Sequence, residues 1–298
     1  MSTATASRDE EKIQDYADSD SLVTTQWVED YLDRFQDNTG DLRLVEVDVD
    51  TTSYDESHIP GAIGWDWESQ LCDQVQRDLT PKDELESLLE ESGISDGTTV
   101  VLYGDNHNWF AAWALWQLEY YGHDDVRLMD GGRQKWIEED RELTSKVPDY
   151  PSGNYSADEP DESIRAYSDN VRQHIEQNPS LVDVRSPEEF TGEKIAPEGM
   201  SETAQRGGHI PGASNISWSD AVQEDGSFKP VDELREIYEN KGDIKAGEES
   251  ITYCRIGERS SHSWFVLSHL LGHENVRNYD GSWTEWGNLV GAPIERGS

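Results

Sequence analysis

A cysteine ends a β-rich run near the C-terminus, in the stretch ITYCRIGERSSHSWFV that begins at Ile251. The thiolate is the reactive form of cysteine, and an ordinary thiol is mostly protonated at neutral pH, so something must hold the negative charge. We expect the residues after Cys254 to curl back over the sulfur with their backbone N–H groups inward. A helix that begins near Ser260 would add the positive end of its dipole. The pattern therefore predicts an anion cradle with a nucleophile at its floor.

The side chains of this loop differ in what they bring to an anion. Gly257 allows a tight turn, and Arg255 and Arg259 add fixed positive charge. Glu258 opposes an anion site, because a carboxylate that points inward raises the pKa of a thiol. We therefore expect Glu258 to point outward or to pair with an arginine. The candidate loop consists of Cys254, Arg255, Ile256, Gly257, Glu258, Arg259 and Ser260.

The chain repeats itself. The segment SHIPGAIGWDW at 57–67 returns as GHIPGASNISW at 208–218, and LVEV at 44–47 returns as LVDV at 181–184. The two spacings differ, which indicates an insertion in the second copy, around TGEKIAPEGMSETAQRGG at 191–208. Such a repeat predicts two homologous domains.

We place one domain at 20–145 and the other at 165–298, joined by a linker at 146–164 that is rich in Pro, Ser, Asp and Glu. Each copy alternates short β-branched runs with helical periods, which predicts an α/β fold with a parallel sheet covered by helices on both faces. Ligands of such sheets bind beyond the carboxyl ends of the strands, where a loop enters the next helix. Cys254 occupies that place in the second copy.

The first copy has no thiol at the corresponding position. Counting back by the repeat spacing from Cys254 gives Gly104, followed by DNHNW. We expect the first domain to be catalytically inactive and Cys72 to be an apolar filler. His58 and His209 occur in identical HIPGA contexts in both copies, which predicts a structural role for both.

The composition limits the partners. Asp and Glu number 63 against 24 Lys and Arg, which gives a formal net charge of -39. Such a surface repels nucleic acid and anionic membranes, and it favours a halophilic protein of a salt-rich cytoplasm, with a cationic partner as the alternative. No stretch approaches the ~20 apolar residues of a membrane span. The two cysteines lie far apart without zinc-ligand spacing, so we expect no metal and no cofactor.

Four motifs together resemble a known family. LVDVR at 181–185, GHIPGA at 208–213, CRIGERS at 254–260 and NYDGSWTEWG at 278–287 are similar to those of tandem rhodanese-domain sulfurtransferases of the thiosulfate:cyanide sulfurtransferase group, in the bacterial and archaeal type with the CRIGERS loop. The resemblance implies two tandem rhodanese-like domains.

The resemblance also implies a reaction. In this family the cysteine, here Cys254, attacks the outer sulfur of thiosulfate, releases sulfite and holds a persulfide that a thiophilic acceptor such as cyanide removes. The family's donor-binding arginine corresponds to Arg185, and Asp183 before it would order the loop. Animal members carry a lysine where this chain has Ile256, so Arg255 and Arg259 must supply the charge.

Three alternatives stay open. Mercaptopyruvate sulfurtransferases use the same loop position, although their loop is usually less charged. A persulfide relay to another protein would need the same nucleophile. A phosphatase on a related fold needs a loop one residue longer between cysteine and arginine than the Cys254–Arg259 loop of this chain.

Overall fold

In the computed structural model the described residues are 3–177, 180–195 and 204–297. They form two compact units. Unit 1 consists of Met1–Asp15, Ser19–Asp161 and Gln223–Phe228, and unit 2 of Tyr16–Asp18, Glu162–Val222 and Lys229–Ser298.

The sheet of unit 1 has five parallel strands in the order β1-β5-β4-β2-β3. All seven residues of the inner strand β2 are buried, as expected of a parallel strand covered on both faces. In register, Leu44 of β2 lies between Ala62 of β3 and Val101 of β4. The strands are β1 (Leu22–Val23), β2 (Leu42–Asp48), β3 (Ala62–Asp66), β4 (Thr99–Tyr103) and β5 (Val126–Met129).

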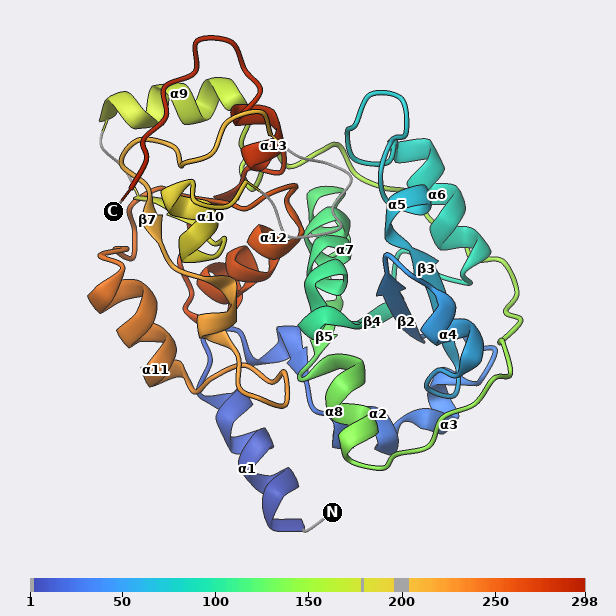
Figure 1. Ribbon diagram of the computed structural model, residues 1–298. Coiled ribbons are helices and arrows are strands. Elements are labelled where there is room, and N and C mark those ends of the chain that lie inside the picture. The colour runs from blue at the N-terminus through green and yellow to red at the C-terminus, as the bar shows by residue number, and fades with distance from the viewer. Residues whose placement is uncertain (1–2, 178–179, 196–203, 298) are drawn as a thin grey trace. The chain divides into compact units, whose positions relative to one another are not determined.

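Helices cover both faces of this sheet (Figure 1). On one face Val28 of α2, Phe35 of α3 and Trp136 of α8 join the core cluster that includes Leu44. Alternate strand residues point the opposite way, and α7, which contacts β2, β4 and β5, covers that side. The helices of unit 1 are α1 (Thr3–Gln14), η1 (Ser19–Ser21), α2 (Thr25–Asp30), α3 (Leu32–Phe35), α4 (Thr52–Glu56), α5 (Trp67–Gln70), α6 (Lys82–Glu91), η2 (Asn106–Asn108), α7 (Trp109–Tyr120) and α8 (Gly132–Glu138).

The sheet of unit 2 is also parallel, with four strands in the order β7-β6-β8-β9. Its core cluster places Leu181 and Ile251 of the strands against Val171 of α9 and Trp286 of α13. On the other face, α12 contacts β8 and β9. The strands are β6 (Ser180–Asp183), β7 (Ser214–Asn215), β8 (Ser250–Tyr253) and β9 (Val276–Asn278).

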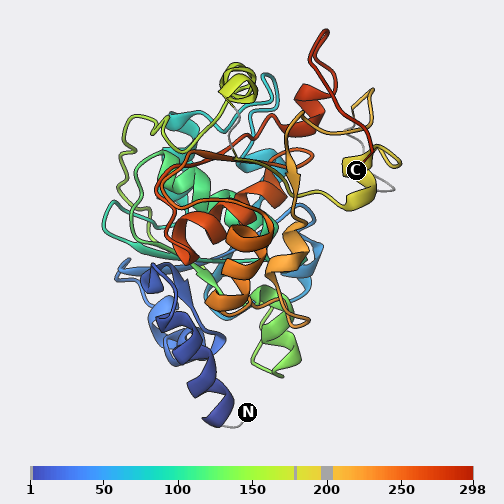
Figure 2. The same cartoon turned by 90° about the vertical axis from the view of Figure 1, so that its left-hand side faces the viewer.

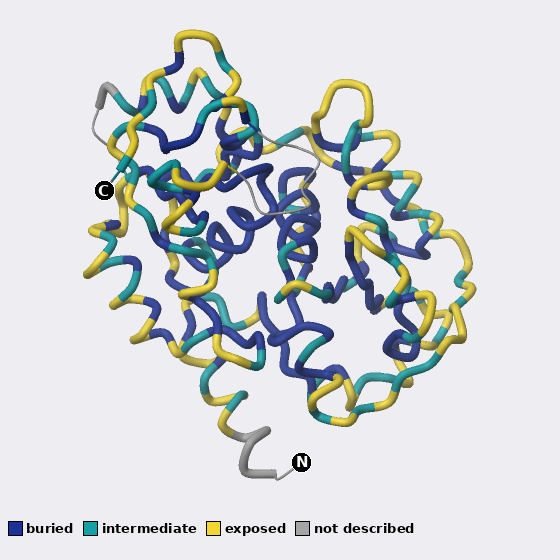
Figure 3. The backbone as a smooth tube through the Cα atoms, viewed as in Figure 1, coloured by how far each residue is buried: buried dark blue, intermediate teal, exposed yellow. Residues whose placement is uncertain are grey.

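The helices of unit 2 include two π-helical segments, each directly after an α-helix. They are α9 (Ser168–Gln177), α10 (Pro187–Thr191), η3 (Trp218–Ala221), α11 (Val231–Arg235), η4 (Glu236–Lys241), α12 (Glu258–Phe265), η5 (Val266–Leu270) and α13 (Ser282–Trp286). The helices that follow β4 and β8 are buried over almost their whole length (Figure 3). A buried helix directly after a central strand positions the loop between them rigidly.

The internal repeat is visible in equivalent hydrogen bonds. The N–H of Arg133 donates to the carbonyl of Gly104 over 3.0 Å, and the N–H of Trp283 donates to the carbonyl of Cys254 over 3.1 Å. In unit 1 the bond joins the turn after β5 to the residue that follows β4. In unit 2 it joins the turn after β9 to the residue that follows β8. The two units therefore share a framework, and they differ in the residue that follows the strand, Gly104 after β4 and Cys254 after β8.

Most of the segment that the sequence predicts as a linker, residues 146–161, packs as part of unit 1. The hydroxyl of Tyr150 donates to the carbonyl of Gly61, and the N–H of Gly153 donates to that of Glu90. A Cβ at Gly153 would lie only 1.9 Å from the carbonyl oxygen of Ile94, so the close approach requires glycine. This segment is therefore hydrogen-bonded to unit 1, although its polar composition does not predict such packing.

Residues 223–228, which the sequence assigns to the second domain, also belong to unit 1. The N–H of Phe228 donates to Asp130 over 2.8 Å. The Nζ of Lys12 in helix α1, dark blue in Figure 2, lies 2.6 Å from the same carboxylate. Within the segment 191–208, predicted as an insertion, residues 196–203 lie outside the described residues.

Candidate active site

Cys254 follows β8 directly and has no exposed surface. The N–H of Gly257 donates to Sγ over 3.1 Å. The N–H of Cys254 itself donates to the hydroxyl of Ser282 over 3.0 Å, which fixes the backbone under the sulfur. The thiol is therefore held at the floor of a turn whose backbone points at it.

Gly257 makes this turn possible. Its φ of 110° lies in a region that residues with a Cβ rarely adopt. The turn leads into α12, and the carbonyl of Gly257 accepts from the N–H of Ser261 and from the hydroxyl of Ser260, both over 2.9 Å. The hydroxyl of Ser260 also lies 2.6 Å from the side-chain oxygen of Asn278 on β9. The loop is thus anchored at both of its ends.

Burial raises the pKa of the Cys254 thiol, and the carboxylate of Glu258 raises it further. Arg259 and the N–H groups of Gly257 and Ser260 act in the opposite direction. The net pKa lies above the ordinary value, so the resting sulfur carries its proton. The cradle is present, but in the resting state it does not by itself produce a thiolate.

Glu258 points inward. It is 3% exposed, and the Sγ of Cys254 donates to its Oε2 over 3.3 Å. Its Oε1 lies 3.7 Å from the Nε of Arg259, so the pairing with an arginine is present while the outward orientation is not. The physical reason is the tight turn at Gly257, after which Glu258, the first residue of α12, lies beside the sulfur.

Arg259 directs its guanidinium at a carboxylate. Its two terminal nitrogens lie 3.1 Å and 3.3 Å from the oxygens of Glu189 on α10. Burial opposes ionisation of Glu189, but Arg259 outweighs it and holds the pKa of Glu189 below its ordinary value. The positive charge that the sequence assigns to the cradle is therefore largely balanced by a residue that sequence reasoning missed.

Glu189 has a local signal of its own. Ser186 and Glu189 form a capping box at the start of α10, in which each side chain bonds the other residue's backbone N–H. The motif Ser-x-x-Glu is readable from sequence and predicts a helix start. Nothing in it predicts the arginine of a distant helix as a second partner.

Arg185 is fully buried beside the loop. Its Nε lies 2.9 Å from Oδ1 of Asp183 and its Nη2 2.5 Å from Oδ2, so this carboxylate holds the guanidinium in place. The guanidinium carbon lies 4.6 Å from the ring centre of Trp283, whose N–H bonds the carbonyl of Cys254. Within the described part of the chain, Nη1 has no hydrogen-bond partner. A buried donor of this kind suits an anionic oxygen of a ligand.

The two remaining loop residues, Arg255 and Ile256, are also buried. The carbonyl of Arg255 accepts from the N–H of Thr284 over 3.0 Å, which ties the loop to α13. All residues of the predicted loop thus lie in unit 2. Arg185 is linked to this loop by Trp283, whose ring contacts the guanidinium and whose backbone N–H bonds the carbonyl of Cys254.

The corresponding position of unit 1 is filled by an amide. The side-chain oxygen of Asn108 accepts from the N–H of Gly104 over 3.0 Å, and its nitrogen donates to the carbonyl of Met129 over 2.8 Å. Asp48 stands at the repeat position of Arg185, and Arg133 pairs with Glu46 over 2.7 Å. This loop has no nucleophile and carries acidic side chains where unit 2 carries a guanidinium.

The other sequence candidates have structural surroundings. His58 bonds the carbonyl of Tyr54 over 2.8 Å and stacks on its ring. His209 bonds the carbonyl of Phe190 over 2.8 Å and stacks on that ring in the same way. Cys72 is half-buried and forms no disulfide. Among the described residues no group of acidic, His and Cys side chains could hold a metal ion. No described helix is long and apolar enough to span a membrane.

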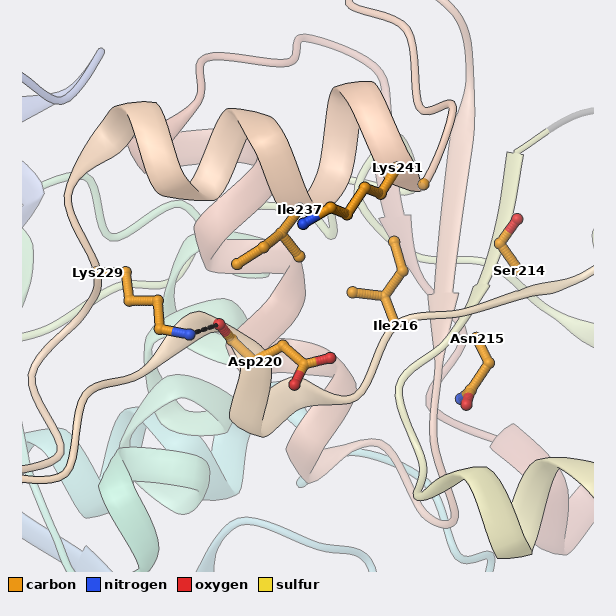
Figure 4. Close-up of a pocket in the computed structure, with 8 residues that line it drawn as sticks. Ser214, Asn215, Ile216, Asp220, Lys229, Ile237 and Lys241 are labelled. Carbon is orange, nitrogen blue, oxygen red and sulfur yellow. Dashed lines mark hydrogen bonds between the residues drawn. The ribbon is translucent and has the colours of Figure 1, made fainter.

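Unit 2 also has a pocket of about 580 Å³ beside the edge strand β7 (Figure 4). Lys229 and Lys241 are among the residues that line it, and the Nζ of Lys229 donates to the carbonyl of Asp220 over 2.8 Å. Cys254 is not among the lining residues, which are Ser214, Asn215, Ile216, Asp220, Lys229, Ile237, Lys241 and Gly242.

A parallel α/β sheet with a cysteine turn between a central strand and a buried helix, repeated once without the cysteine, defines a tandem rhodanese-like protein. The family described as Rhodanese-like domain matches the chain at residues 25–139 and 168–289, and the chain belongs to this family.

Relatives and solved structures agree with this assignment. A protein of Haloferax volcanii that carries the provisional name thiosulfate sulfurtransferase is 60% identical over 284 residues, which cover 95% of this chain and 99% of that protein. Sulfur carrier protein TtuD of Thermus thermophilus is 54% identical over 287 residues, with 95% and 99% covered. The crystal structure of YnjE matches with a TM-score of 0.83 at 26% identity, covering 95% of this chain and 70% of that one.

Proposed function

We propose that this protein is a thiosulfate sulfurtransferase that moves a sulfane sulfur from thiosulfate through a persulfide on Cys254 to a thiophilic acceptor. The observation that carries the proposal is the buried Sγ of Cys254 under the N–H of Gly257, at 3.1 Å. A persulfide formed on this sulfur extends the negative charge into the same turn, where backbone N–H groups can hold it.

Arg185 suits the donor. Thiosulfate brings negatively charged oxygens at one end and the transferable sulfur at the other. Asp183 fixes the guanidinium of Arg185 through Nε and Nη2, while Nη1 has no partner among the described residues. In this proposal Nη1 binds an oxygen of the donor, and Arg255 and Arg259 add positive potential around the loop.

A relay of sulfur to another protein is the second candidate. The observation in its favour is the 54% identity to a protein named as a sulfur carrier. In a relay Cys254 would be loaded in the same way, and an acceptor on another protein would remove the sulfur. 3-Mercaptopyruvate as donor is the other alternative within the same chemistry.

The test combines mass spectrometry and kinetics. After incubation with thiosulfate, the proposal expects one added sulfur atom, located on Cys254 by peptide mapping, and its loss on addition of cyanide. Initial rates with thiosulfate and with 3-mercaptopyruvate, each against cyanide at high salt, identify the donor. Loading without discharge to cyanide favours the relay, and an unlabelled Cys254 with either donor contradicts the sulfurtransferase reaction.

A further inference from the structure

The thiol of Cys254 and the carboxylate of Glu258 form a buried hydrogen-bonded pair. The Sγ–Oε2 distance is 3.3 Å, and both residues are more than nine-tenths buried. The N–H of Gly257 contacts the sulfur from the other side of the turn, over 3.1 Å. A proton that leaves the sulfur therefore has a carboxylate oxygen within direct reach.

The charges around the pair do not replace this acceptor. Arg259 lies 3.7 Å from Glu258 through its Nε, and its terminal nitrogens are bound by Glu189 of α10. Asp183, the last residue of β6, and Arg185 are paired with each other. The hydroxyl of Tyr253 of β8 accepts from the N–H of Ile210 and is hydrogen-bonded to the carboxylate of Asp183. From α13 the contact with Cys254 is the neutral hydroxyl of Ser282, and Arg255 is the remaining charged residue of the loop.

We propose that Glu258 is a catalytic residue, which takes the proton of the Cys254 thiol as Sγ attacks the sulfur donor and returns it when the persulfide is discharged. This inference rests on the proposed function. The pair then carries one negative charge throughout, first on the carboxylate and afterwards on sulfur. A protonated Glu258 is neutral and can donate a hydrogen bond to the sulfur, so the same residue opposes the thiolate before proton transfer and supports it afterwards.

The step balances without a further reactant. The Sγ–H bond breaks and its proton goes to Oε2, while the electron pair left on Sγ forms the bond to the outer sulfur of thiosulfate. The sulfur–sulfur bond of the donor breaks, and sulfite leaves with the electron pair of that bond. Cyanide then attacks the outer sulfur of the persulfide and leaves as thiocyanate, and the thiolate of Cys254 recovers the proton from Glu258.

The pH profile of sulfite release in a single turnover tests the proposal. In the wild-type protein the proton stays inside the pair, so we expect a rate nearly constant between about pH 6 and pH 8. In Glu258→Gln the proton must leave to solvent. We expect a rate lower by about 10²-fold near pH 6, in the range of general acid–base effects, that rises about tenfold per pH unit until the thiol ionises.

Two further variants sharpen the test. Glu258→Asp keeps a base and should keep a flat profile at a reduced rate. Glu188→Gln removes an exposed carboxylate of the same unit and should match the wild type. A Glu258→Gln variant that is as fast as wild type with the same pH profile overturns the inference while leaving the sulfurtransferase intact.

The outcomes separate the two proposals. If thiosulfate does not load Cys254 of the wild-type protein at all, the proposed function fails. If the wild type is loaded but its own rate rises tenfold per pH unit across this range, the proton leaves to solvent and only the role of Glu258 fails. This second result is available even if Glu258→Gln does not fold.

Discussion

The guanidinium of Arg259 lies 3.1 Å and 3.3 Å from the two carboxylate oxygens of Glu189, although 70 residues separate them in the chain. Both side chains are almost fully buried. This pair joins the helix that follows the cysteine loop to α10. It also sets how much of the positive charge of Arg259 reaches the sulfur.

Glu189→Gln should lower both the stability and the thiol pKa. Breaking a buried ion pair costs about 3–5 kcal/mol of unfolding free energy, because it leaves one charge uncompensated. The released charge of Arg259 favours the thiolate, so the alkylation profile of Cys254 should move to lower pH. Chemical denaturation and iodoacetamide rates measure the two effects, and exposed Glu188→Gln is the matched control. An unshifted alkylation profile would mean that the backbone N–H groups alone govern the sulfur.

Cys254→Ser should abolish sulfur transfer and leave the fold intact, since a hydroxyl cannot form a persulfide. Cys72→Ser should retain most activity, because no cradle surrounds that thiol. Circular dichroism, cyanide-dependent thiocyanate formation and mass spectrometry after thiosulfate treatment check these expectations. Substantial turnover by Cys254→Ser, or a sulfur added to Cys72, would contradict the mechanism.

Arg185→Ala should raise the KM for thiosulfate by about 10-fold or more, as expected on loss of a charge-assisted hydrogen bond. The discharge of a preformed persulfide by cyanide should change much less, because in the proposed function the arginine binds the donor and not the acceptor. Measuring both half-reactions on the same variant provides the internal control. Equal losses in the two steps would mean that Arg185 supports the loop through Trp283 instead.

The sequence predicted the parallel α/β units and the position of Cys254 between a strand and a helix, because these follow from local patterns and from the repeat. It left Glu258 either pointing outward or paired with an arginine; the structure has the contact with Arg259, and the contact of Glu258 with the sulfur was not predicted. The partner of Arg259 was also missed, because Glu189 comes from a distant helix. Likewise, residues 223–228 join unit 1 through bonds such as that of Phe228 to Asp130, which no local pattern contains.

Unit 1 offers a prediction about pH. Burial raises the pKa of Asp48 to about 8, and the nearby Asp105 and Glu46 contribute. A carboxyl whose folded pKa is raised binds a proton more tightly in the folded state. Its contribution therefore destabilises the fold progressively as the pH rises from its unfolded pKa near 4 to the folded value.

Asp48→Asn should remove this penalty. We expect the variant to be more stable than the wild type at pH 8 by about 1–3 kcal/mol and to differ much less at pH 5. Thermal unfolding at both values measures the difference, with the exposed Glu56→Gln as the control for a lost carboxylate. A gain of the same size at pH 5 and pH 8 would show that the amide improves packing rather than removing a titration.

The net charge of -39 predicts a strong dependence on salt. At low ionic strength the Debye length grows to ~30 Å, so the acidic surface repels dianionic thiosulfate and destabilises the folded state. At molar salt the Debye length falls to ~3 Å, and the positive groups near Cys254 then dominate the electrostatic potential that the donor meets. Activity should therefore rise with potassium chloride toward molar concentrations, with part of the loss at low salt due to unfolding. Chloride competes for an anion site, so the gain in the donor step should level off.

Circular dichroism and the KM for thiosulfate across a salt series separate folding from binding. A protein that stays folded and works best in dilute buffer would contradict salt adaptation, and a cationic partner would then have to account for the acidic surface.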